Sequence, residues 1–186
     1  MNRCPWTTSE QIYIDYHDLE WGVPVYDSKA LFAKLILDGF QAGLSWITIL
    51  KKRDNFYKAF DDFDPKIISE YDQGKINKLL SNKGIVRNKL KINAAVTNAK
   101  AFLEYESNNG SFSDFLWSFV KDQPIINTWE TIEQVPASSE ESDAMSRDLK
   151  KLGFKFTGTT ICYAFMQAVG MVNDHLITCF RHEQLK

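Results

Sequence analysis

Residues 79–101 read LLSNKGIVRNKLKINAAVTNAKA, and this stretch says most about the fold. A helical pattern ends at Leu80, Gly84 lies in the connection, and a basic helix is predicted from Lys89 onward. Backbone amides around such a turn, at the start of the next helix, can bind a phosphate. The pattern is typical of a helix-hairpin-helix, a clamp on the DNA backbone, at about residues 75–103. The alternative is an ordinary helix end, where glycine is also common.

Helical periodicity continues over the rest of the chain, so the sequence predicts an all-α fold. Asp27 can cap a helix that Gly39 and Gly43 are expected to break, and Asp64-Pro65 is a strong start signal. Strand patterns are nearly absent, and only residues 131–135 and 154–157 are ambiguous. The other predicted helices cover Ile47 to Phe60, Lys89 to Leu103, Asp114 to Val120 capped by Ser113, Ser139 or Ser142 to Leu149 ended by Gly153, and Thr160 to Val172.

Length and composition indicate one globular domain. The 186 residues are 44% hydrophobic and 13% aromatic, enough for one core shared by two helical lobes. The first residues lack the apolar stretch of a signal peptide, and no apolar run is long enough to span a bilayer. Three cysteines without extracellular features suggest a reducing compartment. We therefore expect a cytoplasmic protein without disulfides, forming a single domain over residues 1–186.

Charge is unevenly distributed along a chain whose net charge is only −2. Residues 73–102 contain seven Lys or Arg and neither Asp nor Glu, while acidic residues gather at 61–64 and 140–143. Such separation can create one positive face that binds a phosphate backbone. The alternative is a solvated helix surface, which is the commoner meaning of a charge run.

Two of the three cysteines and two of the three histidines lie in pairs at opposite ends of the chain. Cys4 and His17 are near the start, and His175 and Cys179 are near the end. Two thiolates and two imidazoles form the ligand set of a closed structural zinc site. His175 and Cys179 would share one face if their segment were helical. The alternative is a buried cysteine with surface histidines.

Aromatic residues and one carboxylate suggest a second site. Trp6, Tyr13, Tyr16, Trp21 and Trp46 could converge on one cavity. Flat aromatic walls around a carboxylate suit a flat, electron-poor or cationic heterocycle. Asp38 is the candidate carboxylate, because it follows Leu35, Ile36 and Leu37 and a buried acid needs a reason. The alternative for most of the aromatic residues is ordinary core packing.

Several long strings, in one order, resemble the DNA-3-methyladenine glycosylase I family. They are CPWTTSEQIYIDYHDLEWGVP (4–24), QAGLSWITILKKR (41–53), GIVRNKLKI (84–92), LWSFV (116–120) and GFKFTGTTICYAFMQAVGMVNDH (153–175). The resemblance covers nearly the whole chain. It implies a helix-hairpin-helix glycosylase fold whose two ends are joined by structural zinc, held here by Cys4, His17, His175 and Cys179.

The resemblance also implies the reaction and its residues. The enzyme would act as a monomer on double-stranded alkylated DNA, flip 3-methyladenine out and let water attack the sugar. Stacking aromatics would be Trp6, Tyr13, Tyr16 and Trp46. The turn of Gln41, Ala42, Gly43 and Leu44 would fill the vacated space, with Leu44 as a wedge. Gly84, Arg87 and Lys89 would contact DNA. No nucleophilic lysine is implied, so strand cleavage through a Schiff base is not expected.

The chain departs from the family pattern at the residue that binds the base. Asp38 stands where the family has a glutamate, and its carboxylate reaches about 1.3–1.5 Å less far. Ala164 is a milder departure, since some relatives have serine. One alternative is therefore a lesion-binding or abasic-site-binding protein that has weak or no turnover. Another is a zinc-stabilised scaffold whose aromatic cluster is plain core.

Overall fold

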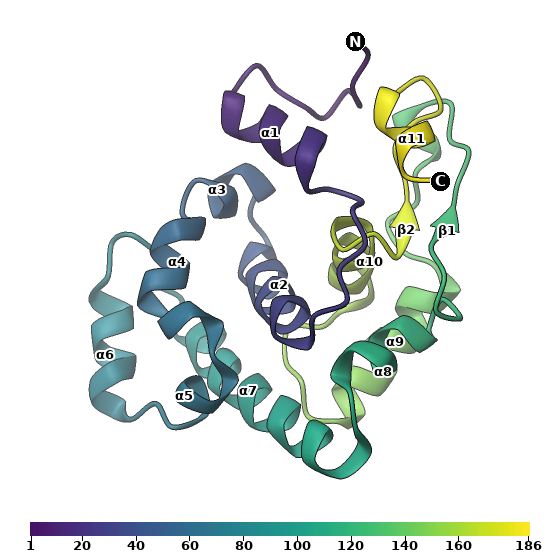
Figure 1. The fold of residues 1–186 in the computed structure, drawn as a ribbon. Helices are drawn as coiled ribbons and strands as arrows, with labels where there is room; N and C mark the ends of the chain where they lie inside the picture. Colours follow the sequence, from purple (N-terminus) through teal and green to yellow (C-terminus); the bar gives the residue numbers. More distant parts are fainter.

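The computed structural model describes residues 1–186, and its architecture is almost entirely helical (Figure 1). The helices are α1 (Gln11–Leu19), α2 (Ser28–Gln41), α3 (Trp46–Leu50), α4 (Arg53–Ala59), α5 (Pro65–Ser69), α6 (Gln73–Ser81), α7 (Lys89–Asn109), α8 (Phe112–Ser118), α9 (Glu140–Lys151), α10 (Thr159–Ala168) and α11 (Phe180–Gln184). Two 3-10 turns are η1 (Asp61–Phe63) and η2 (Ile132–Gln134). No helix is both long and apolar enough to cross a membrane.

A single parallel pair of strands is the one departure from an all-helical fold. The strands β1 (Ile125–Ile126) and β2 (Val172–Asn173) are two residues long each. They lie 47 positions apart in the chain, and neither has a strand-like sequence pattern. The two segments that the sequence left ambiguous, at 131–135 and 154–157, contain no strand.

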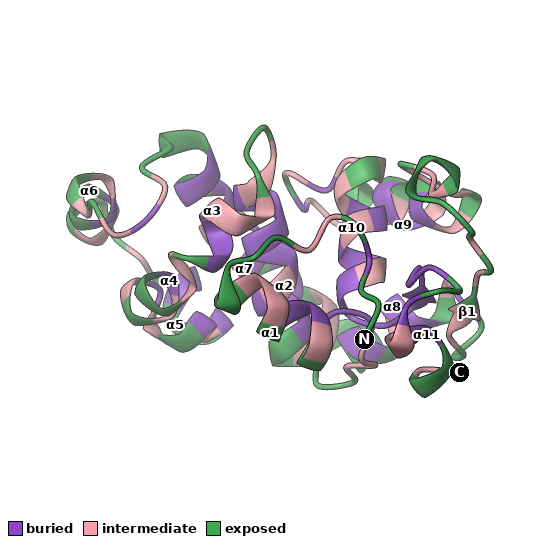
Figure 2. Ribbon diagram, turned by 90° about the horizontal axis from the view of Figure 1, so that it is seen from above, coloured by how far each residue is buried: buried purple, intermediate pink, exposed green.

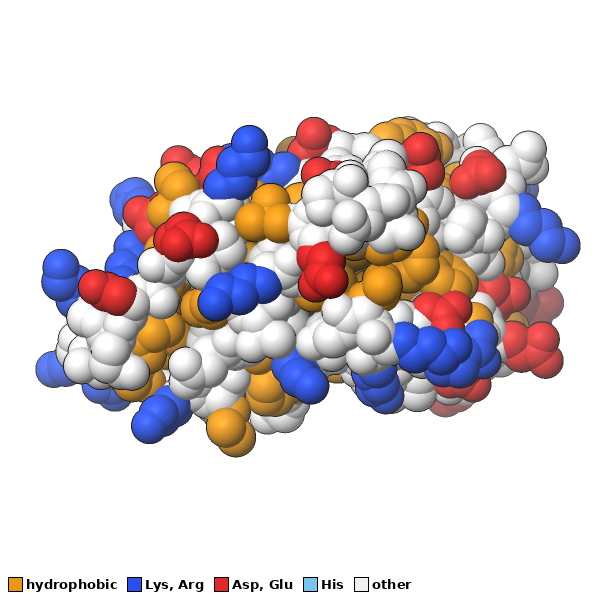
Figure 3. Space-filling model, turned by 90° about the horizontal axis from the view of Figure 1, so that it is seen from below, with side chains coloured by type: hydrophobic (Ala, Val, Ile, Leu, Met, Phe, Trp, Pro, Cys, Tyr) orange, Lys and Arg blue, Asp and Glu red, His pale blue; other side chains and the backbone are white.

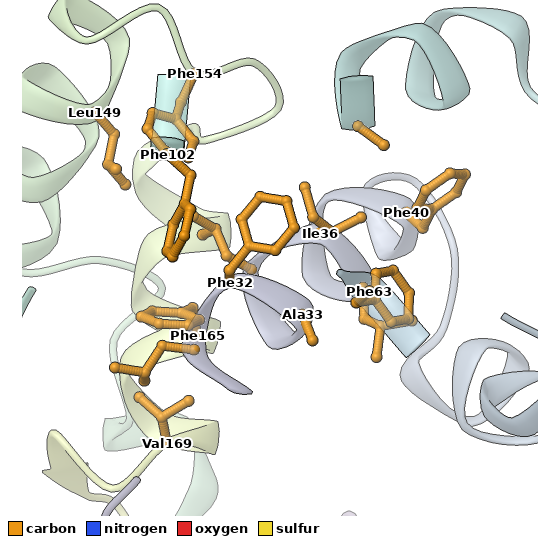
Figure 4. Close-up of a cluster of buried hydrophobic side chains, with 14 of the residues drawn as sticks. Phe32, Ala33, Ile36, Phe40, Phe63, Phe102, Leu149, Phe154, Phe165 and Val169 are labelled. Atoms are coloured by element: carbon orange, nitrogen blue, oxygen red, sulfur yellow. The ribbon is translucent and has the colours of Figure 1, made fainter. Parts of the chain in front are cut away.

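Helix α2 lies at the centre of the molecule. Asp27 caps it by accepting a hydrogen bond of 2.7 Å from the Ala30 amide, as the sequence predicts. Figure 4 shows Phe32 directed toward Phe102, whereas Phe40 lies at the side of Phe63. The band of buried residues along α2 is visible from above in Figure 2. One helix therefore supplies core side chains to both halves of the molecule.

The two halves lie on either side of α2 (Figure 1). One half consists of α3 to α6, and the other consists of α8 to α11 with the two strands. Helix α7 is 21 residues long and contacts α2, α5, α6 and α8, while α10 contacts α2 and α9. The chain ends lie close together at the top of Figure 1, where the segment before α1 meets α11.

Glycines lie at several helix ends, but not at every position where the sequence predicts that a glycine ends a helix. Helix α2 continues through Gly39, so the predicted break there is wrong. A Cβ at Gly39 would lie 3.3 Å from the Phe156 Cβ, so glycine serves close packing rather than helix termination. Gly43, with φ of +77°, does lie in the connection after α2. Gly170, with φ of +75°, turns the chain where an added Cβ would lie 2.5 Å from the Pro24 nitrogen. Helix α10 consequently ends at Ala168 and not at residue 172.

Caps explain most of the remaining helix boundaries. Asp64 caps α5 and Ser139 caps α9, in agreement with the sequence. Ser111 caps α8, so the prediction of Ser113 is wrong, because Ser113 lies inside the helix. The predicted helix from residue 47 to 60 is divided into α3 and α4 at Lys51 and Lys52.

Candidate active site

A cavity of about 220 Å³ opens between α1, α2, α3 and α10. The five aromatic residues that the sequence singled out all line it: Trp6, Tyr13, Tyr16, Trp21 and Trp46. Asp38, Gln41 and Ala164 are also on its wall. The amphipathic turn of α1 contributes Tyr13 and Tyr16, and Trp46 is the first residue of α3. Both N-terminal and central segments therefore build the walls.

The aromatic rings form two groups rather than one stack. Trp6 lies 5.1 Å from Tyr13 and 5.0 Å from Trp21 between ring centroids. Tyr16 and Trp46 form the other group at 5.3 Å. Burial and the charge of Asp38 raise the pKa of the Tyr16 phenol, so this side chain stays protonated and can donate a hydrogen bond. Trp6 also lies 6.5 Å from Tyr16, so the two groups are in contact, and their flat rings on the cavity wall can stack on a flat ligand.

Asp38 projects from the last turns of α2 and is 1% exposed. Its Oδ1 accepts a hydrogen bond from Lys34, one helical turn earlier, while its Oδ2 is buried and has no partner. The indole nitrogen of Trp46 is a buried donor without an acceptor. Burial raises the pKa of the Asp38 carboxyl, and the Lys34 ammonium opposes that rise. A free acceptor and a free donor on the same cavity are groups that a ligand can satisfy.

Lys34 was missed by the sequence analysis, although its i, i+4 spacing from Asp38 was a usable signal. Its ammonium lies 4.0 Å from the centroid of the Trp46 ring, in addition to pairing with Asp38. Burial lowers the pKa of Lys34, and the charge of Asp38 opposes this shift. The floor of the cavity therefore contains an ion pair and not an isolated carboxylate.

Asp174 is a second buried carboxylate on the cavity wall, and it too was missed. Its Oδ1 accepts hydrogen bonds of 2.7 Å from Asn127 and from Trp129. Its Oδ2 accepts from the Tyr163 hydroxyl at 2.7 Å and from Gln167 at 2.8 Å. With four donors, Asp174 has no free acceptor for a ligand. It joins the segment after β1 to α10, and only the folded chain brings these donors together.

Cys4, His17, His175 and Cys179 form a buried group at the closed end of the molecule. Their ligand atoms all lie within 4.8 Å of one another. The Cys179 sulfur is 3.4 Å from His17 Nε2 and 3.5 Å from His175 Nδ1. His175 and Cys179 do not share a helix: they lie on the turn before α11, and Cys179 is the residue before its first turn. This group could hold a metal ion.

The imidazole nitrogens that face away from this group are also occupied. His17 Nδ1 is 2.7 Å from Asp18, whose pKa is lowered by hydrogen bonding to Arg3. His175 Nε2 is 3.1 Å from the Trp21 carbonyl oxygen. These contacts orient both rings with one nitrogen toward the cysteines, which is the usual arrangement around metal-binding histidines.

The loop of Gln41, Ala42, Gly43 and Leu44 follows α2 at the rim of the cavity. Leu44 is 43% exposed, and nothing lies within 4 Å of a Cβ added at Gly43. Lys91 donates hydrogen bonds to the carbonyl oxygens of Phe40 at 2.8 Å and Ala42 at 2.6 Å. Lys91 is one of the seven basic residues between positions 73 and 102, but its ammonium is buried against this loop and anchors it, so it adds nothing to an exposed positive face.

The turn between α6 and α7 contains Gly84 and Arg87, and Lys89 is the first residue of α7. Arg87 and Lys89 are exposed and take part in no ion pair. The Gly84 amide donates a hydrogen bond of 2.8 Å to the Asn82 side chain. The sequence suggested an amide free to bind a phosphate, but this one is occupied. Figure 3 shows Lys and Arg side chains gathered, with some carboxylates, toward the end of the molecule that carries α4 to α6.

Comparisons with known proteins agree on one family. A model of the methyladenine glycosylase family matches residues 6–182. The chain is 50% identical over 179 residues to DNA-3-methyladenine glycosylase 1 of Escherichia coli, covering 96% of each protein. A crystal structure of a 3-methyladenine DNA glycosylase I is similar with a TM-score of 0.95 and 51% identity, covering 96% of this chain and 98% of that one. The Staphylococcus aureus enzyme, solved to explain 3-methyladenine recognition, has a TM-score of 0.93 and 39% identity, with 97% and 96% covered.

Proposed function

The chain belongs to the methyladenine glycosylase family and is therefore a hydrolase of N-glycosidic bonds, and we propose that it removes 3-methyladenine from alkylated double-stranded DNA. The observation that carries this proposal is the cavity itself. It has aromatic walls and a buried carboxylate oxygen without a hydrogen-bond partner. A flipped-out purine could stack on the rings and donate a hydrogen bond from its amino group to Asp38 Oδ2.

The proposed chemistry asks little of the protein beyond binding. Methylation at N3 makes the base cationic and weakens the bond between N9 and the sugar C1′. The electron pair of that bond goes to the base, and water adds to C1′ and loses a proton. Trp6, Tyr13, Tyr16 and Trp46 would hold the base, and Asp38 would fix its orientation. Lys34 is paired with Asp38 at the floor of the cavity, so we expect no Schiff base and no strand cleavage.

We propose that Leu44 enters the duplex where the base has left, as the tip of the exposed loop after α2. Its exposure and the anchoring of the loop by Lys91 support this role. Arg87 and Lys89 would contact phosphates from the turn after α6, which we propose to be a helix-hairpin-helix within a single domain. Asn82 would have to release the Gly84 amide before that amide could contact a phosphate.

We propose structural zinc in the group of Cys4, His17, His175 and Cys179. Zinc bonds of about 2.3 Å to sulfur and about 2.0–2.1 Å to nitrogen place tetrahedral ligands about 3.6 Å apart. The sulfur–nitrogen distances of 3.4 and 3.5 Å fit that geometry. A bound zinc ion would stabilise the fold. Four protein ligands leave no position for a catalytic water, so the group would hold Trp6 and Trp21 in place and take no part in the reaction.

Release of free 3-methyladenine from alkylated DNA tests the proposed function. The native chain should release the base, and Asp38→Glu should do so at least as fast, because the longer side chain restores the reach of the glutamate expected from the family resemblance. The second candidate is a lesion-binding protein without turnover, which the shorter Asp38 favours. Tight binding to an abasic-site duplex with no base release by the native chain would establish that candidate and exclude the enzyme.

A further inference from the structure

Lys34 occupies the place on the cavity floor where a positively charged ligand would be stabilised. Its ammonium pairs with the single oxygen of Asp38 that is not free and lies over the Trp46 ring. A carboxylate and the face of an aromatic ring both attract a cation in such a cavity. Asp38 and Trp46, at the floor, already have the Lys34 ammonium as their cation.

The charge of Lys34 has no other partner in the molecule. The nearest candidate is Glu20, which lines a neighbouring cavity of about 350 Å³ together with Lys34. Glu20 accepts a hydrogen bond of 2.9 Å from Arg53, however, and Asp38 forms the only ion pair of Lys34. The Lys34–Asp38 pair at the floor is therefore electrically balanced before any base enters, and the charge of Asp174, elsewhere on the cavity wall, is shared among four hydrogen-bond donors.

The proposed reaction changes the charge of the base. A nucleotide methylated at N3 carries a positive charge on the purine, and breaking the bond from N9 to C1′ sends the electron pair to the ring. The departing base is then neutral, and the positive charge is on the sugar until water adds and loses a proton. A fixed ammonium at the cavity floor repels the bound cation more than it repels the departing neutral base. Such a difference lowers the barrier of the bond-breaking step.

We propose that the charge of Lys34 makes the cavity bind neutral bases in preference to cationic ones. The same charge thereby promotes departure of the base. The inference rests on the proposed glycosylase function. Lys34 would then act in the chemical step and in the choice of base, in addition to forming its ion pair with Asp38.

The test compares Lys34→Met with the native chain. Methionine has a similar length and no charge, and Lys34→Arg keeps the charge. Lys29→Met is the matched control, since Lys29 is on the same helix, is 47% exposed and pairs with Asp64 outside the cavity. Melting temperature and bound zinc are measured for each variant, so that a folding defect is recognised.

Binding is measured at about pH 8 with two free bases, neutral 3-methyladenine and the cation 3,9-dimethyladeninium. The native chain should prefer the neutral base. Lys34→Met should shift the ratio of the two dissociation constants toward the cation by roughly tenfold or more, because it removes a like charge. Lys34→Arg and Lys29→Met should leave the ratio unchanged. A ratio that stays within about threefold in Lys34→Met would overturn the proposal.

Single-turnover kinetics on alkylated duplex DNA give the second measurement. Lys34→Met should lower the rate at saturating enzyme roughly tenfold without raising the half-saturating enzyme concentration. A lower rate with a higher half-saturating concentration would instead indicate loss of ordinary binding and would also overturn the proposal. If the native chain releases no base at all, the proposed function fails. If the native chain is active and Lys34→Met has the same rate and the same ratio of dissociation constants, only the role of Lys34 is refuted.

Discussion

Two buried carboxylates on the same cavity differ in how many of their hydrogen-bond acceptor positions are occupied. Asp174, next in the chain to His175 of the terminal Cys/His group, accepts four hydrogen bonds and has no free oxygen. Asp38, on α2, accepts one from Lys34 and leaves Oδ2 without a partner. Both are 2% exposed or less, so burial alone does not distinguish them. The difference teaches that the unfilled hydrogen-bonding capacity of a buried acid marks the place for a ligand, while a filled acid is part of the framework.

Removal of one of the proposed zinc ligands should have the largest effect on stability, because the metal would hold the framework around Asp174 together. Structural zinc contributes on the order of 10 kcal/mol, comparable with the whole stability of a domain. Cys179→Ser should therefore lose the metal and unfold at much lower temperature, and a chelator should do the same to the native chain. Metal content and melting temperature are the measurements.

Cys162→Ala provides the control for this experiment. Cys162 is the third buried cysteine and lies on α10, outside the ligand group. This variant should keep its metal and lose only the packing of one small side chain. A Cys179→Ser protein with full metal content would show that the four residues do not act as a metal site.

Asp174→Ala should have the next largest effect on stability. The change leaves four donors without their acceptor, the buried Tyr163 and the half-buried Asn127, Trp129 and Gln167, at a cost of about 3 kcal/mol or more. Urea unfolding measures the loss, and base release should fall only as far as the folded fraction falls. If Asp174→Ala were as stable as the native chain but inactive, Asp174 would belong with Asp38 as a ligand-binding residue.

Asp38→Ala should show the reverse pattern. We expect the rate of base release to fall on the order of 100-fold, because the base loses its orienting acceptor. Stability should fall less than in Asp174→Ala, since only one hydrogen bond is lost and the burial that lowers the pKa of Lys34, no longer opposed by Asp38, favours its neutral form. Parallel urea unfolding and base-release assays measure both. Equal loss of stability in the two variants would remove the distinction between the two carboxylates.

Leu44→Ala should have the smallest effect and none on stability. Its exposed side chain makes no core contact, so the expected result is a roughly tenfold slower release from duplex DNA. Release from single-stranded alkylated DNA should be unchanged, because no partner base has to be replaced. Leu19→Ala, at a more exposed leucine away from this loop, is the control. Equal slowing on both substrates would argue against a wedge.

Local signals in the sequence predicted the framework well. Asp27, Asp64 and Ser139 cap helices through their own neighbours, so their roles are encoded within four residues. Cys4, His17, His175 and Cys179, which the structure brings together, stand out because cysteine and histidine are rare in this chain. Ser113 was predicted as the cap of α8, whereas Ser111 is the cap, because a serine at either position can cap and only the backbone decides between them.

The cavity was less predictable, because its chemistry depends on contacts between distant segments. The donors to Asp174 come from residues 127–167, and Lys91 reaches the loop after α2 from 49 positions away. No local pattern encodes these contacts. Lys34 is different, because its i, i+4 spacing from Asp38 is visible in the sequence. The sequence does not show that the pair is buried in the cavity, which is what indicates a role for it.

The terminal ligand group also sets an order of events during synthesis. Its members stand at positions 4, 17, 175 and 179, so a ribosome must make almost the entire chain before the fourth ligand exists. Trp6 and Trp21 can be fixed over the cavity only after that point. A chain interrupted before Cys179 would lack the fourth ligand, and with it the metal that we propose to hold Trp6 and Trp21 over the cavity.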